Sequence, residues 1–241
     1  MKNPLREARL AIRAWRGHIH NERARRGPAP EQRRRITDAF HRLYYDGHRS
    51  GTTWGDTWWL GVRTEKCPLD LWIYQEMIFT LRPDVIVETG TRFGGSALFL
   101  ASMCDLVGNG SVVSVDIEAM ADRPVHPRIE YLTGSSVAPD IVRAVQQRIP
   151  SGARVLVVLD SDHSADHVRL ELEAYAPLVT RGSYLIVEDT NLGGNPIGAD
   201  FGPGPMAAVK EFLARHAEFC ADPAKEKFLL TFSPGGYLRR T

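Results

Sequence analysis

Hydrophobic residues along most of this chain occur in short blocks with two different spacings. One kind is a short run rich in Val, Ile and Leu, which is typical of strands buried in a parallel sheet. Such runs occupy residues 85–87, 112–117, 129–132, 155–159 and 184–187. Between them, apolar residues recur every three or four positions, as on one face of a helix. These helical patterns cover residues 68–81, 137–149, 164–179 and 206–217, and a further helix opens at 96–101. The alternation predicts an α/β fold with a doubly wound, mostly parallel sheet.

The C-terminal end of the chain carries a different pattern. Two apolar segments, 228–232 and 237–239, flank a turn-forming Ser-Pro-Gly-Gly sequence. This pattern predicts a hairpin, which adds an antiparallel strand to the sheet. Together with the five parallel strands, it predicts a seven-stranded, Rossmann-like sheet with a terminal antiparallel hairpin.

The first fifty residues differ from the rest in charge. Residues 1–49 contain thirteen Lys or Arg and five Asp or Glu, whereas the remainder contains seventeen and twenty-four. We therefore divide the chain into a basic helical N-terminal arm, 1–50, and an α/β domain, 51–241. A basic arm suits nucleic-acid binding, a membrane surface, or packing against the body or a neighbouring subunit. Because no nucleic-acid module accompanies the arm, we favour packing or homo-oligomer formation and expect no nucleic-acid partner.

Helical spacing predicts two helices in the arm, over residues 4–25 and 31–46, with a Gly-Pro-Ala-Pro break between them. On the second helix, Ile36, Phe40 and Leu43 are expected to point inward.

Composition limits the class of protein further. The chain is 43% hydrophobic, which is enough for a substantial core, but no apolar run approaches the roughly 20 residues of a membrane span. The N-terminus lacks the apolar region of a secretory signal. Three widely separated cysteines match neither a zinc spacing nor a disulfide framework. We expect a cytoplasmic protein with no membrane partner.

A glycine-rich turn, from Glu88 to Ser96, joins a predicted strand to a predicted helix. Gly90 allows a sharp turn, and the spacing G-x-x-x-G-G differs from the G-x-G-x-x-G of dinucleotide-binding folds. The helix N-terminus favours a carboxylate, whereas the strand-end Glu88 suits an ammonium or a hydroxyl. A ligand with both an amino group and a carboxylate, such as S-adenosylmethionine, fits this pattern. The alternative is an ordinary turn of some other α/β protein.

Polar residues end the neighbouring strands as well. In open α/β sheets, ligands bind beyond the carboxyl ends of the strands. Asp116 lies twenty-six residues after Gly90, at a strand end where an acid can bind both hydroxyls of a ribose. The alternative for Asp116 is a solvated strand-end acid. The predicted cofactor contacts are Glu88, Gly90, Thr91, Ser96, Asp116, Ser135 and Ser136.

Three carboxylates follow two predicted strands. Asp160 ends one, and Glu188 with Asp189 ends the next. Clustered carboxylates repel one another unless a cation or protons neutralise them, and all-oxygen ligation selects a hard ion such as Mg²⁺. The alternative is that Glu188 and Asp189 pair with arginines or cap a turn, and Asp162 is a possible substitute ligand.

His163 lies three residues after Asp160 and can accept a proton near neutral pH. A metal-bound hydroxyl loses its proton more easily, so Asp160 and His163 form the predicted catalytic pair. His167 is the competitor, although its place in a helix favours a structural role. The long loop at 190–205 directly follows the metal candidates and is expected to be a lid or a substrate loop.

These residues together resemble the family of rhamnosyl O-methyltransferases and cephalosporin hydroxylases. The resemblance covers roughly residues 52–241. Its motifs are the approach from Trp59-Leu60-Gly61 to Lys66-Cys67-Pro68, the turn at 88–96, Asp160, and Ile186-Val187-Glu188-Asp189. The resemblance implies the methyltransferase sheet, homo-oligomers, and a role in natural-product biosynthesis, including antibiotics. It also implies that Asp160, Glu188 and Asp189 hold Mg²⁺ and that His163 is the base.

The sequence therefore predicts a Mg²⁺- and S-adenosylmethionine-dependent O-methyltransferase. Its expected substrate is a small glycosylated molecule with a rhamnose-like sugar hydroxyl. One alternative is a cephalosporin-type hydroxylase, although no set of two histidines and one carboxylate is evident. The other is a non-enzymatic binding protein that keeps a methyltransferase-like fold.

Overall fold

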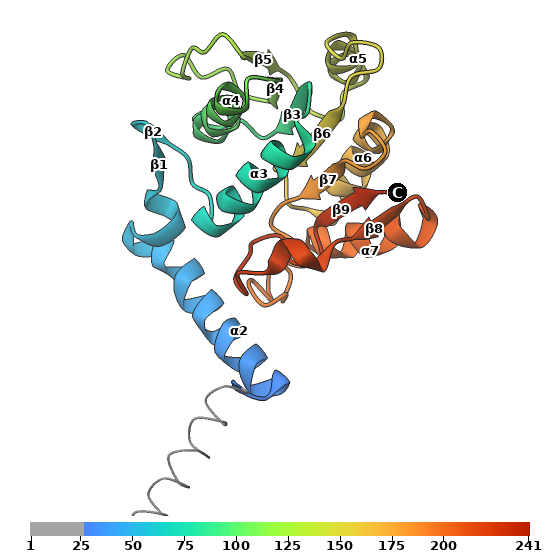
Figure 1. Cartoon of the computed structure of the whole chain (residues 1–241). Helices are drawn as coiled ribbons and strands as arrows, with labels where there is room; N and C mark the ends of the chain where they lie inside the picture. Colours follow the sequence, from blue (N-terminus) through green and yellow to red (C-terminus); the bar gives the residue numbers. More distant parts are fainter. Residues whose placement is uncertain (1–26) are drawn as a thin grey trace, which may run out of the picture. The chain divides into compact units, whose positions relative to one another are not determined.

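The computed structural model describes residues 27–241 (Figure 1). The chain separates into a unit that ends at Phe40 and a second unit, His41–Thr241. The elements in chain order are α2 (Pro30–Asp46), η1 (Gly47–Ser50), η2 (Thr53–Asp56), β1 (Trp58–Trp59), β2 (Val62–Arg63), α3 (Pro68–Leu81), β3 (Val85–Thr89), α4 (Gly95–Val107), β4 (Ser111–Asp116), β5 (Ile129–Thr133), α5 (Pro139–Gln147), β6 (Val155–Leu159), α6 (Ala165–Tyr175), η3 (Ala176–Leu178), β7 (Tyr184–Val187), α7 (Pro205–Arg215), β8 (Phe219–Ala221), η4 (Pro223–Glu226) and β9 (Tyr237–Arg240).

The second unit is built on a seven-stranded sheet with the order β5-β4-β3-β6-β7-β9-β8. The first five strands are parallel, and β9 and β8 are antiparallel additions at one edge. All residues of β3, β6 and β7 are buried, as the uninterrupted apolar runs predict. The predicted seven-stranded, doubly wound sheet is confirmed.

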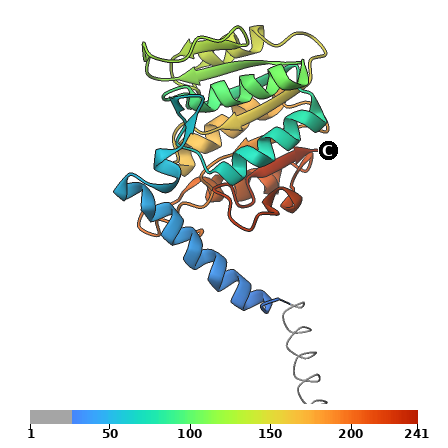
Figure 2. The same ribbon diagram turned by 60° about the vertical axis from the view of Figure 1, so that its left-hand side comes forward.

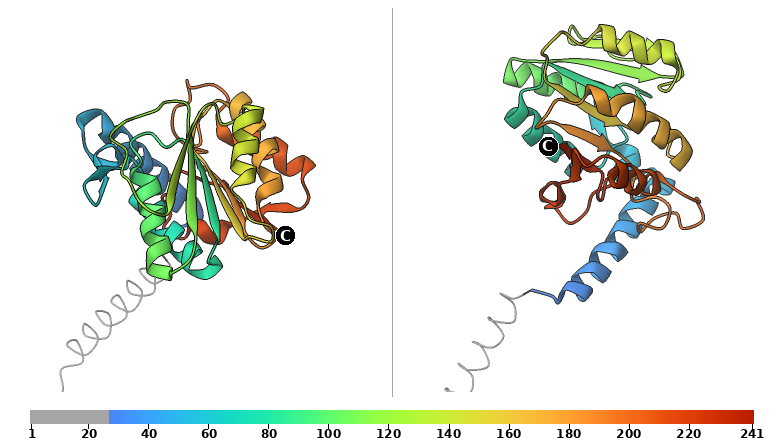
Figure 3. Two further views of the ribbon diagram at one scale, coloured as in Figure 1. Left: turned by 90° about the horizontal axis from the view of Figure 1, so that it is seen from above. Right: turned by 90° about the vertical axis from the view of Figure 1, so that its right-hand side faces the viewer.

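Helices cover both faces of the sheet (Figure 3). Alternate strand residues point to opposite faces, so each strand contributes to two hydrophobic clusters. Ile86, Leu156 and Ile186 pack with α3 and α4 on the face seen in Figure 2. Val87, Val157 and their neighbours pack with α5, α6 and α7 on the other face.

The predicted pairing of residues 237–239 with residues 228–232 in a hairpin is wrong. β9 pairs with β8, which comes from residues 219–221, and residues 228–232 form no strand. The reason is the buried carboxylate of Asp70, on α3. Asp70 accepts a hydrogen bond from the backbone N–H of Phe232 at 2.8 Å and another from the Tyr237 hydroxyl at 2.9 Å. The segment before β9 is thus bonded to a helix instead of a strand.

The predicted arm is described only in part. The predicted helix 4–25 lies outside the described residues, while α2 matches the second predicted helix. The prediction that Ile36, Phe40 and Leu43 point inward is wrong, since these side chains are 56%, 50% and 71% exposed. Helical periodicity identified a common face but could not show whether anything covers it.

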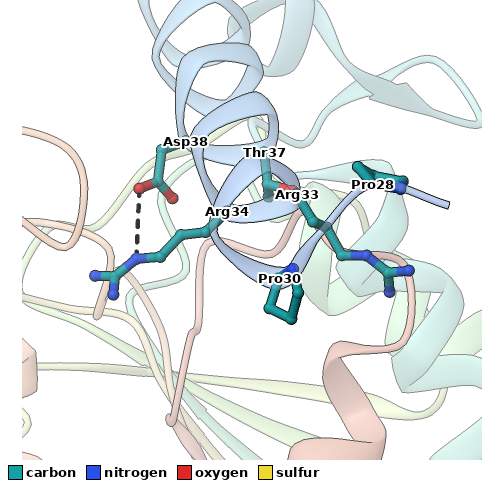
Figure 4. A pocket seen from close by; sticks show the side chains of 6 residues that line it. All are labelled: Pro28, Pro30, Arg33, Arg34, Thr37 and Asp38. Carbon is teal, nitrogen blue, oxygen red and sulfur yellow. Dashed lines mark ion pairs between the residues drawn. The ribbon is translucent and has the colours of Figure 1, made fainter.

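A pocket of about 510 Å³ lies at the start of α2 (Figure 4). Arg33 and Arg34 line it together with Asp38, and Arg34 Nε lies 3.7 Å from a carboxylate oxygen of Asp38. An exposed ion pair of this kind contributes little free energy. Asp38, the one carboxylate among the described residues that line this pocket, pairs with Arg34, whereas the second unit brings several acidic side chains and a histidine together.

We expect Asp70→Ala to destabilise the protein. The substitution leaves the N–H of Phe232 and the hydroxyl of Tyr237 buried without their acceptor, and a buried unsatisfied polar group costs about 1–3 kcal/mol. Urea denaturation should report this loss in the free energy of unfolding. Asp200→Ala, at an exposed loop position, is the matched control. Equal stability of the two variants would contradict the role of Asp70.

Candidate active site

Sheet register brings the predicted strand ends to one edge. Thr89 at the end of β3 is paired with Val115 of β4 on one side and with Leu159 of β6 on the other. Leu159 is in turn paired with Val187 of β7. The residues that follow are Gly90, Asp116, Asp160 and Glu188, and they emerge at the same level. Chain order reverses between β3 and β6, which is where open α/β sheets bind ligands.

Gly90 makes the contact between the β3 and β6 ends possible. Its φ is +84°, and a Cβ at this position would overlap the carbonyl oxygen of Asp160. Gly95, the first residue of α4, packs in the same way against the carbonyl of Arg63. Gly90 and Gly95 are therefore required by close backbone approaches, and Gly94 between them has a φ of +82°, which favours glycine.

Glu88 lies beneath this turn and is 1% exposed. Its Oε2 accepts a hydrogen bond from the Ser114 hydroxyl at 2.6 Å, and Ser114 in turn shares a 2.6 Å hydrogen bond with Thr91. Oε1 is buried and finds no hydrogen-bonding partner within residues 27–241. Burial raises the pKa of Glu88 to about 7, against the opposing charge of Lys66. Ser96, also predicted, is buried at the start of α4 and lines the adjoining cavity.

Asp116 is held in place by the loop that follows β4. Its two carboxylate oxygens accept the N–H groups of Arg92, at 2.6 Å, and Glu118, at 2.8 Å. The buried guanidinium of Arg123 lies 3.2 Å from the same carboxylate. These contacts fix the orientation of Asp116 while it still lines a cavity, so the structure differs from the alternative of a freely solvated acid.

Ser135 and Ser136 line the same cavity of about 340 Å³ as Gly90 and Asp116. The Ser136 hydroxyl lies 3.0 Å from Nε2 of His167. His167 is thus tied to the cavity wall. All the predicted cofactor residues except Glu88 line two adjoining cavities at one edge of the sheet, and Glu88 is buried beneath the turn.

Asp160, Glu188 and Asp189 gather at the ends of β6 and β7, as predicted, and His163 joins them. Nε2 of His163 lies 3.2 Å from a carboxylate oxygen of Asp189. Asp160, His163 and Asp189 each offer one ligand atom, and these atoms lie within 4.8 Å of one another. Asp189 has a φ of +52°, an uncommon backbone angle that turns it toward His163.

Lys66 belongs to this cluster, although sequence reasoning did not assign it to the site. Its Nζ donates to Oδ2 of Asp160 and, at 2.7 Å, to Oε2 of Glu188. The hydroxyl of Tyr74 donates to the other oxygen of Glu188 at 2.7 Å. Both oxygens of Glu188 are therefore occupied. The alternative that Glu188 and Asp189 pair with arginines is correct in part, because Glu188 does pair with a basic side chain, but that side chain is a lysine. The sequence signal that could have pointed to a lysine here is the cluster of three carboxylates, because such a cluster needs a cation to neutralise it.

Burial and charge shift the pKa values of this cluster. Burial raises the pKa of Asp160, Glu188 and Asp189, while the ammonium of Lys66 opposes the rise. Burial alone would lower the pKa of His163, but the carboxylates of Asp189 and Asp160 outweigh it and the pKa is raised. Without a further cation, His163 therefore holds its proton more strongly than a free imidazole does.

Aromatic side chains face the carboxylates across a cavity of about 480 Å³. Tyr45, Trp54 and Phe232 line this cavity, and their rings lie within 5.7 Å of one another, centre to centre. The indole N–H of Trp54 is bonded to the carbonyl of Tyr45 at 3.0 Å, which fixes the ring. Trp58 and Trp59 line a separate, apolar cavity of about 440 Å³.

The predicted substrate loop is held by internal hydrogen bonds. Ile197 N–H donates to the carbonyl of Asn191 at 3.0 Å, and Leu192 and Ile197 are buried. The side-chain amide of Asn191 lies 3.0 Å from Nε2 of His41. A role as a lid stays a prediction. Across residues 27–241, the helices are too short or too polar to cross a lipid bilayer.

Two known proteins that are similar in sequence to this chain carry the same name. The rhamnosyl O-methyltransferase of Mycobacterium leprae (strain TN) is 37% identical over 213 residues, which cover 85% of this chain and 90% of the relative. The rhamnosyl O-methyltransferase of Mycobacterium tuberculosis (strain ATCC 25618 / H37Rv) is 33% identical over 212 residues, with 85% of both chains covered.

Two solved structures share the fold at lower identity. CmcI with Mg-SAM matches with a TM-score of 0.58 and 21% identity, covering 77% of this chain and 76% of CmcI. The apo-structure of a CmcI variant matches with a TM-score of 0.59 and 22% identity over the same shares. A family model, Rhamnosyl O-methyltransferase/CmcI, matches residues 52–241. The chain belongs to this family.

Proposed function

We propose that this protein is an O-methyltransferase that uses S-adenosylmethionine and Mg²⁺ to methylate a sugar hydroxyl of a small glycosylated molecule. The observation that carries the proposal is the joining of two sites at one sheet edge. Gly90, Thr91 and Asp116 line one, with Glu88 buried beneath the turn, and the carboxylate cluster with His163 forms the other. The relatives named rhamnosyl O-methyltransferases support a sugar substrate.

The residues around Gly90 suit S-adenosylmethionine, which would supply the methyl group. The unpartnered Oε1 of Glu88 is an acceptor suited to the amino group, although it is buried. Asp116 is held so that it can accept hydrogen bonds from ribose hydroxyls, and Ser135 and Ser136 line the continuation of that cavity.

The carboxylates of Asp160 and Asp189 suit a hard divalent ion, because Mg²⁺ prefers oxygen ligands. Bound there, Mg²⁺ would supply positive charge that lowers the cost of ionising a substrate hydroxyl. Glu188 as a third ligand stays a prediction, since Lys66 and Tyr74 hold both its oxygens.

His163 is the proposed base. Asp189 orients the imidazole through the 3.2 Å contact at Nε2, and His163 faces the same cavity as the carboxylates. A neutral imidazole at this position can accept the proton of a substrate hydroxyl. The rings of Tyr45, Trp54 and Phe232 line the same cavity and would limit the access of water to a bound substrate.

The finer assignments are proposals as well. We propose a rhamnose-like deoxysugar, a natural-product pathway and a cytoplasmic location, in which the free thiols of Cys67, Cys104 and Cys220 stay reduced.

A methyl-transfer assay over a panel of deoxysugar conjugates, with and without Mg²⁺, tests the proposed activity. We expect transfer that a chelator abolishes and Mg²⁺ restores. Oxygen consumption with a substrate, and no methyl transfer, would favour a hydroxylase instead.

Cofactor binding should depend on pH through Glu88. Its pKa of about 7 means that Glu88 takes up a proton as the pH falls, and the ammonium of the cofactor needs the ionised form. Affinity should therefore fall below about pH 7, by at most about tenfold per pH unit for one proton. Calorimetry with S-adenosylhomocysteine would measure it. Glu88→Gln should remove this dependence, whereas Glu118→Gln, at the exposed rim, should keep it.

Turnover should depend on His163. We expect His163→Ala to lower turnover by about 10²–10⁴ while cofactor and metal affinity stay nearly unchanged. The wild-type rate should rise with pH as His163 loses its proton, and this limb should vanish in the variant. His167→Ala is the control, because His167 contacts Ser136 instead of Asp189. If both variants keep the limb, the base lies elsewhere.

The exposed face of α2 supports the proposed homo-oligomer. Ile36 and Leu43 are each more than half exposed on it. We expect light scattering to give a multiple of the 26.9 kDa chain mass, and Ile36→Asp with Leu43→Asp to reduce it. Gln32→Asp, an exposed polar position on the same helix, should have no effect. A monomeric wild-type protein would contradict the proposal.

A further inference from the structure

Lys66 places a positive charge inside the carboxylate cluster. Its side chain is 7% exposed, and its Nζ contacts Asp160 and Glu188, which follow two different strands. Asp160 and Glu188 are themselves only 16% and 8% exposed at their side chains. This is a buried ion pair, in which charges are screened far less by solvent than at the surface.

The backbone of Lys66 is fixed independently of this pairing. Its N–H donates to the hydroxyl of Thr57 at 3.1 Å, and the same hydroxyl lies 3.3 Å from its carbonyl oxygen. Cys67 then caps α3, and Pro68 is the first helical residue. The ammonium is thus delivered to the cluster by a short segment that is anchored at both ends.

The contacts of Lys66 leave one side of the cluster open. Lys66 uses one oxygen of Asp160 and one of Glu188, and Tyr74 uses the remaining oxygen of Glu188. The ligand atoms in mutual reach belong to Asp160, His163 and Asp189. A metal would therefore share Asp160 with Lys66 and feel its charge at close range.

Charge gives Lys66 a specific role. Asp160, Glu188 and Asp189 carry three negative charges when ionised, and Lys66 returns one. With His163 neutral, a divalent cation brings the sum of these charges to zero, whereas a trivalent cation leaves an excess. We propose, building on the magnesium site above, that Lys66 is the resident counter-ion of the metal centre. It holds Asp160 and Glu188 before the metal binds, and it matches the cluster to a divalent cation.

The proposal predicts tighter metal binding when the charge is removed. In Lys66→Met, the affinity for Mg²⁺ should rise on the order of tenfold. Because Coulomb energy scales with the charge of the ion, the affinity for Tb³⁺ should rise on the order of thirtyfold. Calorimetry with MgCl₂ and terbium luminescence measure both on the full-length, metal-free protein. Lys210→Met, an exposed lysine on α7, controls for the change in net charge.

A double variant separates charge from position. Lys66→Met with Glu188→Gln removes one charge of each sign and should return the ratio of Tb³⁺ to Mg²⁺ affinity to the wild-type value. Metal-free Lys66→Met should also melt at a lower temperature than the double variant, in which fewer carboxylates repel one another. This melting comparison also applies if Lys66→Met folds poorly without metal.

Three outcomes would overturn the proposal. Weaker or unchanged metal binding in Lys66→Met would mean that Lys66 only positions its partners. A double variant that keeps the altered ion ratio would show that charge is not the cause. Wild-type protein that binds neither ion would refute the magnesium site itself, and the charge-matching role with it, even if methyl transfer persists.

Discussion

Gly90 and the carbonyl of Asp160 share a space that only a glycine leaves open. The carboxyl ends of β3 and β6 can adjoin because no Cβ stands between them. One side of this contact carries Glu88 and the cofactor residues, and the other carries the carboxylate cluster. The position of the proposed cofactor site relative to His163 thus depends on a backbone contact, and the side chains add charge and hydrogen bonds to a geometry that is already set.

At this edge of the sheet, basic side chains lie directly beside acidic ones. The buried carboxylates raise one another's pKa. Lys66 pairs with Glu188 on one side of the cluster, and His163 contacts Asp189 on the other. A site with this much uncompensated negative charge is costly to fold around. The cost is offset in part by the ion pairs, and metal binding would offset more of it. The burial that raises the pKa values of these carboxylates also favours the binding of a cation among them.

Local patterns in the sequence predicted most of the fold and the positions of the site residues. Two predicted strands, 155–159 and 184–187, match the structure residue for residue, because buried parallel strands have continuous apolar runs. The predicted helix at 68–81 matches residue for residue as well. The prediction failed where a distant partner decides. Residues 228–232 look like a strand but bond to Asp70, which lies more than 150 positions away. Lys66 was invisible as a site residue for the same reason, since its partners lie 94 and 122 positions further along.

The chain around the start of α3 is fixed at two points that lie four residues apart. Lys66 is bonded to residues that follow β6 and β7, and Asp70 is bonded to Phe232 and Tyr237 near the C-terminal end. Contacts of such long sequence separation form late, because the intervening chain must first be ordered. During synthesis, the lysine and the aspartate leave the ribosome long before their partners exist. The carboxylate cluster can therefore be completed only after the chain has been made more than 120 residues beyond Lys66.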